Sequence, residues 1–322
     1  MTTNTLLGIS AVAALAFGGV NAPAQEYPSK LVRFIVPYAP GGATDAVGRS
    51  ISQKLTEAWG QQVVVDNRPG AQGNLGAGLG AKASPDGYTL VLTDTGTMAI
   101  APWMHKNLSF HPLRDFVHIT QASSQPYLVV AHPSLPAKSL KELAALAKAQ
   151  PDTLTFASTS QGNRFSGELF KIMTRTRIIH VPYKGGGQAI TDLLGGYVTL
   201  MFASPTSSTP HVNNKRLRGL AVTGPSRLPA LPDVPTATEA GYPDLTVTSW
   251  YGVAVPVNTP NDIVAKLNAG ILRALKLPDV ITRLKSVGLE PGGNSSEEFT
   301  AYVKSEYERW GKVVKESGVA PE

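Results

Sequence analysis

Residues 31–59 read LVRFIVPYAPGGATDAVGRSISQKLTEAW, and this stretch decides the fold class. The apolar run Leu31–Val36 predicts a buried strand, and the Gly- and Pro-rich residues 37–44 predict a tight loop after it. A helix is expected to begin near Asp45. Its apolar residues recur at a spacing of four and would share one face: Val47, Ile51, Leu55 and Trp59. A strand, a short loop and a helix in this order form the unit of α/β folds.

The same unit recurs along the chain, which predicts an α/β fold with mostly parallel sheets. Further strands are expected at 63–65, 88–92, 154–157 and 178–180, with a Gly-rich helix between the first two. Ser139 and Glu142 have the spacing of a capping box and predict a helix to about Ala149. Late helices are expected to begin at 259–262 and 295–298. The last of these would pack on a core through Phe299, Val303, Trp310 and Val314.

Length and composition narrow the class of protein. The 322 residues are long enough for about two domains. The net charge of +6 comes from scattered lysines and arginines without a basic stripe, so no nucleic acid is expected as a partner. The absence of cysteine excludes thiol catalysis and disulfides, and the six histidines show no metal-binding spacing. No metal and no cofactor are therefore expected.

The N-terminal residues predict export. Leu6–Val20 is an uncharged, mostly apolar run, and Ala22-Pro23-Ala24 follows it shortly afterwards. This pattern is typical of a secretory signal peptide, residues 1–24, cleaved after Ala24, although Met1–Thr5 contains no lysine or arginine. No later segment is long and apolar enough to span a membrane. The mature protein is therefore expected in the periplasm.

Polar, glycine-rich loops precede several of the predicted helices. They lie at 40–44, 158–163 and 183–187, with 93–98 as a possible fourth. A helix N-terminus exposes unpaired N–H groups and a partial positive charge, so these loops could together hold a small carboxylate. Ligands of open α/β sheets bind at the carboxyl ends of the strands, where such loops lie. The candidate ligand-binding residues are Tyr38, Pro40, Gly41, Gly42, Ala43, Thr44, Asp45, Thr95, Gly96, Thr97, Ser158, Thr159, Ser160, Gly162, Asn163, Tyr183, Gly185 and Gly186.

Two other classes of function receive less support. Residues 76–81 read GAGLGA and fit a loose dinucleotide-binding pattern, but they begin eleven residues after the strand that should lead directly into them. The glycines are better explained by close helix packing. The motifs of P-loop nucleotide hydrolases and of α/β-hydrolases are both absent. A secreted hydrolase stays an alternative, because dispersed Ser, His and Asp residues could still assemble into a catalytic triad.

Several short motifs resemble those of the extracytoplasmic solute receptors of tripartite tricarboxylate transporters, the Bug receptors. They occur in the family's order over residues 26 to 318, and their combination is specific. The matching stretches are Tyr27-Pro28, Pro40-Gly41-Gly42-Ala43-Thr44-Asp45, Val65-Asp66-Asn67-Arg68-Pro69-Gly70-Ala71, Ser84-Pro85-Asp86-Gly87-Tyr88, Val181-Pro182-Tyr183-Lys184-Gly185-Gly186, Leu231-Pro232-Asp233-Val234-Pro235-Thr236, Trp250-Tyr251-Gly252 and Arg309-Trp310-Gly311.

The resemblance implies a two-lobed periplasmic solute-binding fold with a hinged cleft and no catalysis. Lobe 1 would comprise 25–124 and 250–322, and lobe 2 would comprise 125–249, with crossings near 123–125 and 249–251. The resemblance also implies a ligand held by backbone amides, hydroxyls and water. The expected partners of this monomer are a small organic carboxylate and the permease subunits of a transporter. A receptor that signals to a membrane sensor is the alternative.

Two departures from the family pattern bear on the ligand. Ala203 stands where many relatives have an aspartate that could face an ammonium group. Arg164 stands where relatives usually have a histidine, and it could either reach a ligand carboxylate or be a solvated residue of the first helical turn. Both positions complete the set of candidates. Together they favour a carboxylate ligand that lacks an amine.

Overall fold

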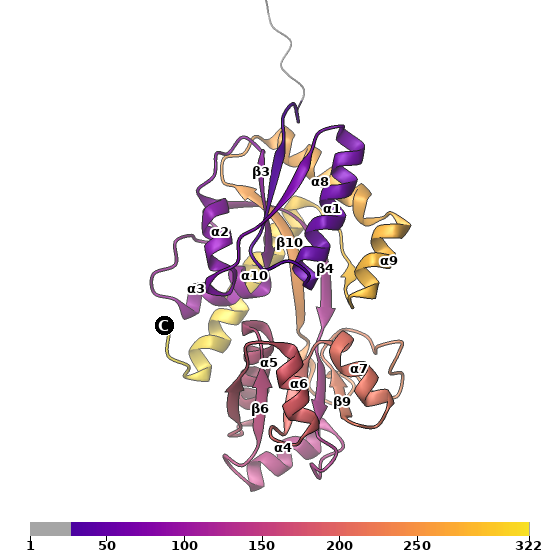
Figure 1. Cartoon of the computed structure of the whole chain (residues 1–322). Coiled ribbons are helices and arrows are strands. Elements are labelled where there is room, and N and C mark those ends of the chain that lie inside the picture. The colour runs from indigo at the N-terminus through magenta and orange to yellow at the C-terminus, as the bar shows by residue number, and fades with distance from the viewer. Residues whose placement is uncertain (1–26, 322) are drawn as a thin grey trace, which may run out of the picture.

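The computed structural model describes residues 27–321, which form two lobes built on two separate sheets (Figure 1). The predicted signal peptide, residues 1–24, lies outside this range. The first sheet has the strand order β11-β4-β10-β3-β1-β2. Its strands are β1 (Val32–Val36), β2 (Val63–Asn67), β3 (Thr89–Asp94), β4 (Phe116–Pro126), β10 (Thr248–Pro256) and β11 (Glu290–Pro291).

The second sheet has the strand order β7-β6-β8-β5-β9 and forms the lower lobe in Figure 1. Its strands are β5 (Leu128–Ala131), β6 (Thr155–Ser158), β7 (Ile179–Pro182), β8 (Leu200–Ala203) and β9 (Arg218–Val222). The α/β class and the two-lobed architecture predicted from the sequence are confirmed.

The prediction that the sheets are mostly parallel needs correction, because both sheets are mixed. β1 pairs in parallel with β2 and β3, and β6 pairs in parallel with β7 and β8. β10 is antiparallel to β3 and β4, and β5 is antiparallel to β8 and β9. These antiparallel pairs contain the strands that lead into and out of the passages between the lobes. Those strands run in the opposite direction to the neighbouring strands.

Helices cover both faces of the first sheet. The core cluster on one face contains Ile51 of α1 (Ala43–Trp59), Leu267 of α8 (Asn261–Leu275) and Leu284 of α9 (Pro278–Ser286). The opposite face packs against α2 (Asn74–Ala81), α3 (Ala101–Met104) and α10 (Ser296–Ser317). As predicted, Phe299, Val303, Trp310 and Val314 of α10 are all buried. α8 begins within the predicted range, with Pro260 as its N-cap residue and no side-chain cap, and the Thr259 hydroxyl donates to the carbonyl of Pro256.

The second lobe contains α4 (Leu140–Ala149), α5 (Gln161–Thr174), α6 (Gly186–Leu194) and α7 (Pro205–Asn213). The Ser139 hydroxyl caps α4 by accepting from the N–H of Glu142. The chain enters this lobe between Pro126 and Leu128, and it returns to the first sheet at Thr248. β4 and β10 pair with each other up to Pro126 and Thr248. The boundaries predicted at 124/125 and 249/250 divide the chain into two lobes that would move relative to one another. These boundaries stay predictions.

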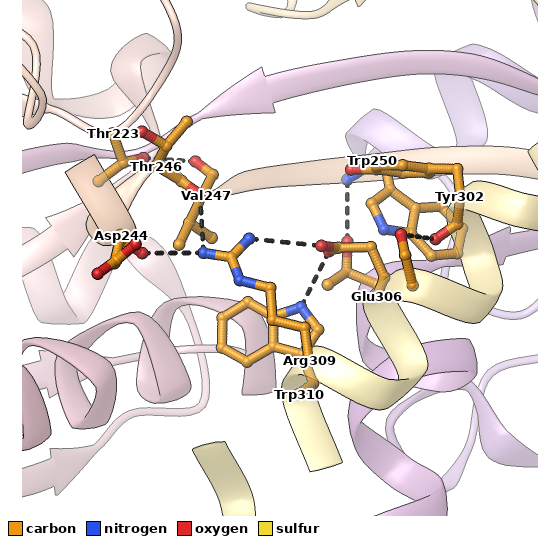
Figure 2. A network of polar contacts seen from close by, with 11 residues as sticks. Thr223, Asp244, Thr246, Val247, Trp250, Tyr302, Glu306, Arg309 and Trp310 are labelled. Atoms are coloured by element: carbon orange, nitrogen blue, oxygen red, sulfur yellow. Dashed lines mark hydrogen bonds and ion pairs between the residues drawn. The ribbon is translucent and has the colours of Figure 1, made fainter. Parts of the chain in front are cut away.

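Helix α10 also ties the first lobe to the segment that leads back from the second. Arg309 donates to the carbonyls of Asp244 and Thr246, at 3.0 and 2.8 Å, just before β10 begins (Figure 2). Glu306 lies between Arg309 and the indole N–H of Trp310, and it accepts hydrogen bonds from both. This contact is made outside the two crossing strands, β4 and β10. It therefore attaches the first lobe to the returning segment at a third place.

Candidate functional site

A cavity of about 560 Å³ lies between the lobes. The loops after β1, β3 and β6 form its walls, together with residues of the two crossings. The carboxyl ends of these strands therefore face one space, as expected for ligand binding in α/β proteins. The lining residues are Tyr38, Ala39, Pro40, Gly42, Ala43, Thr44, Gln72, Asp94, Thr95, Gly96, Tyr127, Thr159, Ser160, Gln161, Gly162, Ser249 and Tyr251.

The N-terminus of α1 forms the wall on the first lobe. Gly42 is the N-cap residue and supplies no side-chain cap, so the N–H groups of Ala43 and Thr44 have no partner within the helix. Asp45 lies behind this wall, where its carboxylate accepts from the N–H of Gly41 and from Arg49. Burial alone would raise the pKa of Asp45, but the hydrogen bonds from Arg49 and Gly41 lower it below the usual value. Asp45 thus holds the loop in place as a neutralised anion.

The N-terminus of α5 forms the facing wall on the second lobe. Ser160 and Asn163 make a reciprocal capping box, and the Asn163 side-chain oxygen also accepts from the N–H of Thr159. These contacts fix the loop and leave the N–H groups of Gln161 and Gly162, both at the cavity, without an intrahelical partner. A Cβ on Gly162 would lie 2.3 Å from the Tyr127 hydroxyl oxygen, so only glycine fits here without displacement.

The charge pattern of the cavity suits an anion. Within residues 27–321, the cavity lining contains no lysine, arginine or histidine, and its one acidic residue is Asp94. Positive potential is supplied by the two helix N-termini, which approach from opposite lobes. Burial raises the pKa of Tyr38, Tyr127 and Tyr251, so their hydroxyls are neutral hydrogen-bonding groups at physiological pH. The described residues also contain no group of His, Cys, Asp or Glu able to hold a metal ion.

About half of the candidates predicted from the sequence line this cavity. They are Tyr38, Pro40, Gly42, Ala43, Thr44, Thr95, Gly96, Thr159, Ser160 and Gly162. Three other candidates lie just behind the lining and hold its loops. Asp45 and Asn163 do so as described above, and Thr97 donates its N–H to Asp94 at 3.0 Å. Gly41, the remaining residue of the first loop, donates its N–H to Asp45 rather than lining the cavity.

The other candidates are not part of the cavity lining, and their role in ligand binding stays a prediction. Tyr183 donates its hydroxyl to Asp192, and the exposed glycines Gly185 and Gly186 begin α6. Ala203 is fully buried in β8, and Arg164 lies over the ring of Phe165. Ser158 contacts His180, as described below.

Seven lining residues are not among the sequence candidates: Ala39, Gln72, Asp94, Tyr127, Gln161, Ser249 and Tyr251. Ser249 and Tyr251 fall in the predicted crossing, but no loop motif marks them as lining residues. Tyr127 sits alone between β4 and β5, and Gln72 lies in the short helix η1 (Ala71–Gly73). Ala39, Asp94 and Gln161 fall inside the predicted loops, so their positions alone mark them as candidate lining residues.

The arrangement of Ser158 and His180 does not make a hydrolytic triad. The Ser158 hydroxyl lies 2.7 Å from Nε2 of His180, and Ser158 is buried behind the cavity wall. Burial, together with the charges of Arg164 and Lys171, lowers the pKa of His180 to about 4. A triad needs a carboxylate that orients the imidazole and stabilises its charged form. The groups that act on His180 instead disfavour its charged form.

The protein has two lobes, each built on a sheet, that are joined by two crossings and have a cavity suited to an anion between them. This architecture is that of the periplasmic solute-binding proteins. Solved structures support this class. An R. palustris protein with adipate is 35% identical with a TM-score of 0.79, and 92% of this chain and 100% of that chain are covered. MatC from Rhodopseudomonas palustris, with bound malate, is 33% identical with a TM-score of 0.76, covering 89% and 100%.

Residues 47–319 match the family described as tripartite tricarboxylate transporter family receptor, TctC. Protein BugT of Bordetella pertussis is 34% identical over 309 residues, covering 94% of this chain and 95% of BugT. The chain therefore belongs to the tripartite tricarboxylate transporter receptor family, which includes the Bug proteins. Its family and structural neighbours are solute receptors and not enzymes, which confirms the prediction that this chain is not an enzyme.

Proposed function

We propose that the protein captures a small dicarboxylate in the periplasm and delivers it to the membrane permease of a tripartite tricarboxylate transporter. The observation that carries this proposal is the pair of helix N-termini, α1 and α5, at one cavity without a cationic side chain. Each N-terminus can take one carboxylate group through unpaired N–H groups. A ligand with a carboxylate at each end would contact both lobes at once.

The chemistry of relatives supports the same ligand class. The two solved relatives described above hold adipate and malate, which are both dicarboxylates. Micromolar binding requires about 8 kcal/mol. Charge-assisted hydrogen bonds contribute about 1.5–3 kcal/mol each, offset by several kcal/mol of association cost. Five or six bonds from Ala43, Thr44, Gln161, Gly162 and the neighbouring hydroxyls would therefore suffice.

The ligand is expected to lack an amine. Asp45 is already neutralised by Arg49, and Ala203 supplies no carboxylate. We expect succinate to bind about tenfold more tightly than aspartate, and adipate more tightly than 2-aminoadipate by the same factor, or roughly 1.4 kcal/mol. Titration calorimetry on the mature protein, after a thermal-shift screen of organic acids, measures both pairs. Equal or tighter binding of the amino acids would contradict the expectation.

Family membership supports the periplasm as the compartment, and the signal peptide is part of this proposal. We expect N-terminal sequencing of periplasmic material to begin within a few residues of Gln25, and the mature protein to be a soluble monomer. No helix in the described part of the chain is long and apolar enough to cross a membrane. Delivery to a permease predicts that deleting the gene abolishes uptake of the bound acid. Normal uptake with loss of a transcriptional response would instead indicate a sensor partner.

A further inference from the structure

Asp94 is the acidic residue of the cavity lining, and its surroundings are unusual for an ionised carboxylate. It is the last residue of β3, its exposed fraction is 6%, and it stands opposite Tyr251 of β10 in the sheet register. Its hydrogen bonds come from neutral groups. The Tyr38 hydroxyl donates to Oδ2 at 2.8 Å, and the N–H of Thr97 donates to Oδ1 at 3.0 Å. The N–H of Gly96 is a further donor.

No cationic side chain of the cavity lining, within residues 27–321, balances this carboxylate. The titratable groups that face it are three tyrosines: Tyr38 from the loop after β1, Tyr127 from between β4 and β5, and Tyr251 from β10. All three have raised pKa values and carry no positive charge. Burial also raises the pKa of Asp94, although the hydrogen bonds from Tyr38, Thr97 and Gly96 oppose that shift.

An anionic ligand in the same cavity would act on Asp94 as a like charge. Two carboxylates that share a poorly solvated site cannot both ionise without a large cost, and one of them takes up a proton instead. The network of Tyr38 is suited to that change. Its hydroxyl lies 3.1 Å from the carbonyl of Gln72 as well as 2.8 Å from Asp94. Tyr38 can therefore keep an acceptor when Asp94 becomes neutral.

We propose that Asp94 takes up one proton when the receptor binds its anionic ligand, and that the resulting carboxylic acid donates a hydrogen bond to a ligand oxygen. This inference rests on the proposed function and adds a selection rule to it. The proton comes from solvent, so binding adds one proton to the complex. The ligand must present an oxygen acceptor to Asp94. A ligand with an ammonium group there would instead need Asp94 to stay ionised.

Calorimetry can count the proton directly. Adipate and malate are titrated at several values between about pH 6.5 and about pH 8.5, where ordinary carboxylic acids are fully ionised. Each titration is repeated in buffers with different ionisation enthalpies. We expect uptake of up to one proton per site, and an affinity that rises up to about tenfold for each unit of decrease in pH. Binding without proton uptake across this range would overturn the proposal.

Two variants locate the proton. Asp94→Asn keeps a hydrogen-bond donor and is neutral at every pH, so it should bind without proton uptake and at least as tightly as the wild type near the upper pH. Asp66→Asn is the matched control, because Asp66 is paired with Arg33 and Arg68 outside the cavity. It should keep the full uptake. Loss of binding in Asp94→Asn, together with a wild type that takes up no proton, would show that Asp94 accepts from a ligand hydroxyl or ammonium instead.

The thermal stability of the ligand-free protein tests the inference on Asp94 independently of the proposed function. If burial disfavours the ionised form, its folded pKa lies above its unfolded pKa, and the ionised carboxylate costs stability as pH rises. Asp94→Asn should then melt higher than the wild type near pH 8, and the difference should shrink toward pH 4.5. Failure of both acids to bind would count against the proposed function. Equal melting of the two proteins at both pH values would count against the inference on Asp94.

Discussion

Substituting Gly162 by alanine tests whether the N-terminus of α5 is part of the ligand site. The new Cβ would lie 2.3 Å from the Tyr127 hydroxyl oxygen, where ordinary contact begins at 3.4 Å, so the two groups must separate by about 1 Å. Tyr127 is buried, and its hydroxyl bonds to Ser160 and Ser249. Either Tyr127 or the first turn of α5 must therefore move, and both line the cavity.

The expected loss of affinity follows from the contacts at this wall. A shift of about 1 Å would break one or two charge-assisted hydrogen bonds to the ligand, at about 1.5–3 kcal/mol each. This corresponds to a roughly ten- to 150-fold weaker affinity for one bond, and more for two. The strain, about 1–3 kcal/mol, is partly offset by the gain of up to about 1 kcal/mol when alanine replaces glycine in a helix. Binding should therefore suffer more than stability.

Titration calorimetry with adipate and malate, with thermal melts of the same samples, separates the two effects. Gly187→Ala is the matched control. Gly187 also lies in the first turn of a second-lobe helix, α6, but a Cβ there meets nothing within 4 Å, and Gly187 lies outside the cavity lining. We expect normal binding by this control. If Gly162→Ala binds within twofold of the wild type, or if Gly187→Ala weakens binding equally, the assignment of the ligand to the α5 N-terminus is refuted.

Three further predictions concern the lobes and the core. A ligand that touches both lobes favours the closed state, so saturating adipate should reduce the radius of gyration in small-angle scattering, and an unchanged radius with binding confirmed would exclude closure. Arg309→Met removes the bonds to Asp244 and Thr246 and should lower the free energy of unfolding in urea by about 1–2 kcal/mol, whereas Arg283→Met on the exposed surface of α9 should not. Burial lowers the pKa of His118 from 6.5 to about 4, so the unfolded state binds the proton first as pH falls. His118 should thus cost on the order of 3 kcal/mol of stability between about pH 6.5 and about pH 4, and a His118→Gln variant should show a correspondingly flatter pH dependence of unfolding.

Local patterns in the sequence determined much of the fold. The apolar run before Pro37, the spacing of Val47, Ile51 and Leu55, and the caps at Ser139 and Ser295 each act over a few residues. Helix periodicity and capping depend on neighbours along the chain, so they can be predicted without knowledge of the tertiary structure. The loops after β1, β3 and β6 were predicted as ligand loops for the same reason, and they do line the cavity.

Only the tertiary structure decided strand direction and the membership of the cavity. β10 is antiparallel to β3 and β4, and this pairing places residues from near position 250 beside residues near 92 and 120. Asp94, Tyr127 and Tyr251 meet there across long sequence separations, and no local pattern records that meeting. The loop at Tyr183 has the same local character as the loop at Ser160, yet it lies outside the cavity. A sequence pattern can indicate that a helix N-terminus is able to bind an anion, but the packing of distant elements determines which N-termini share one space.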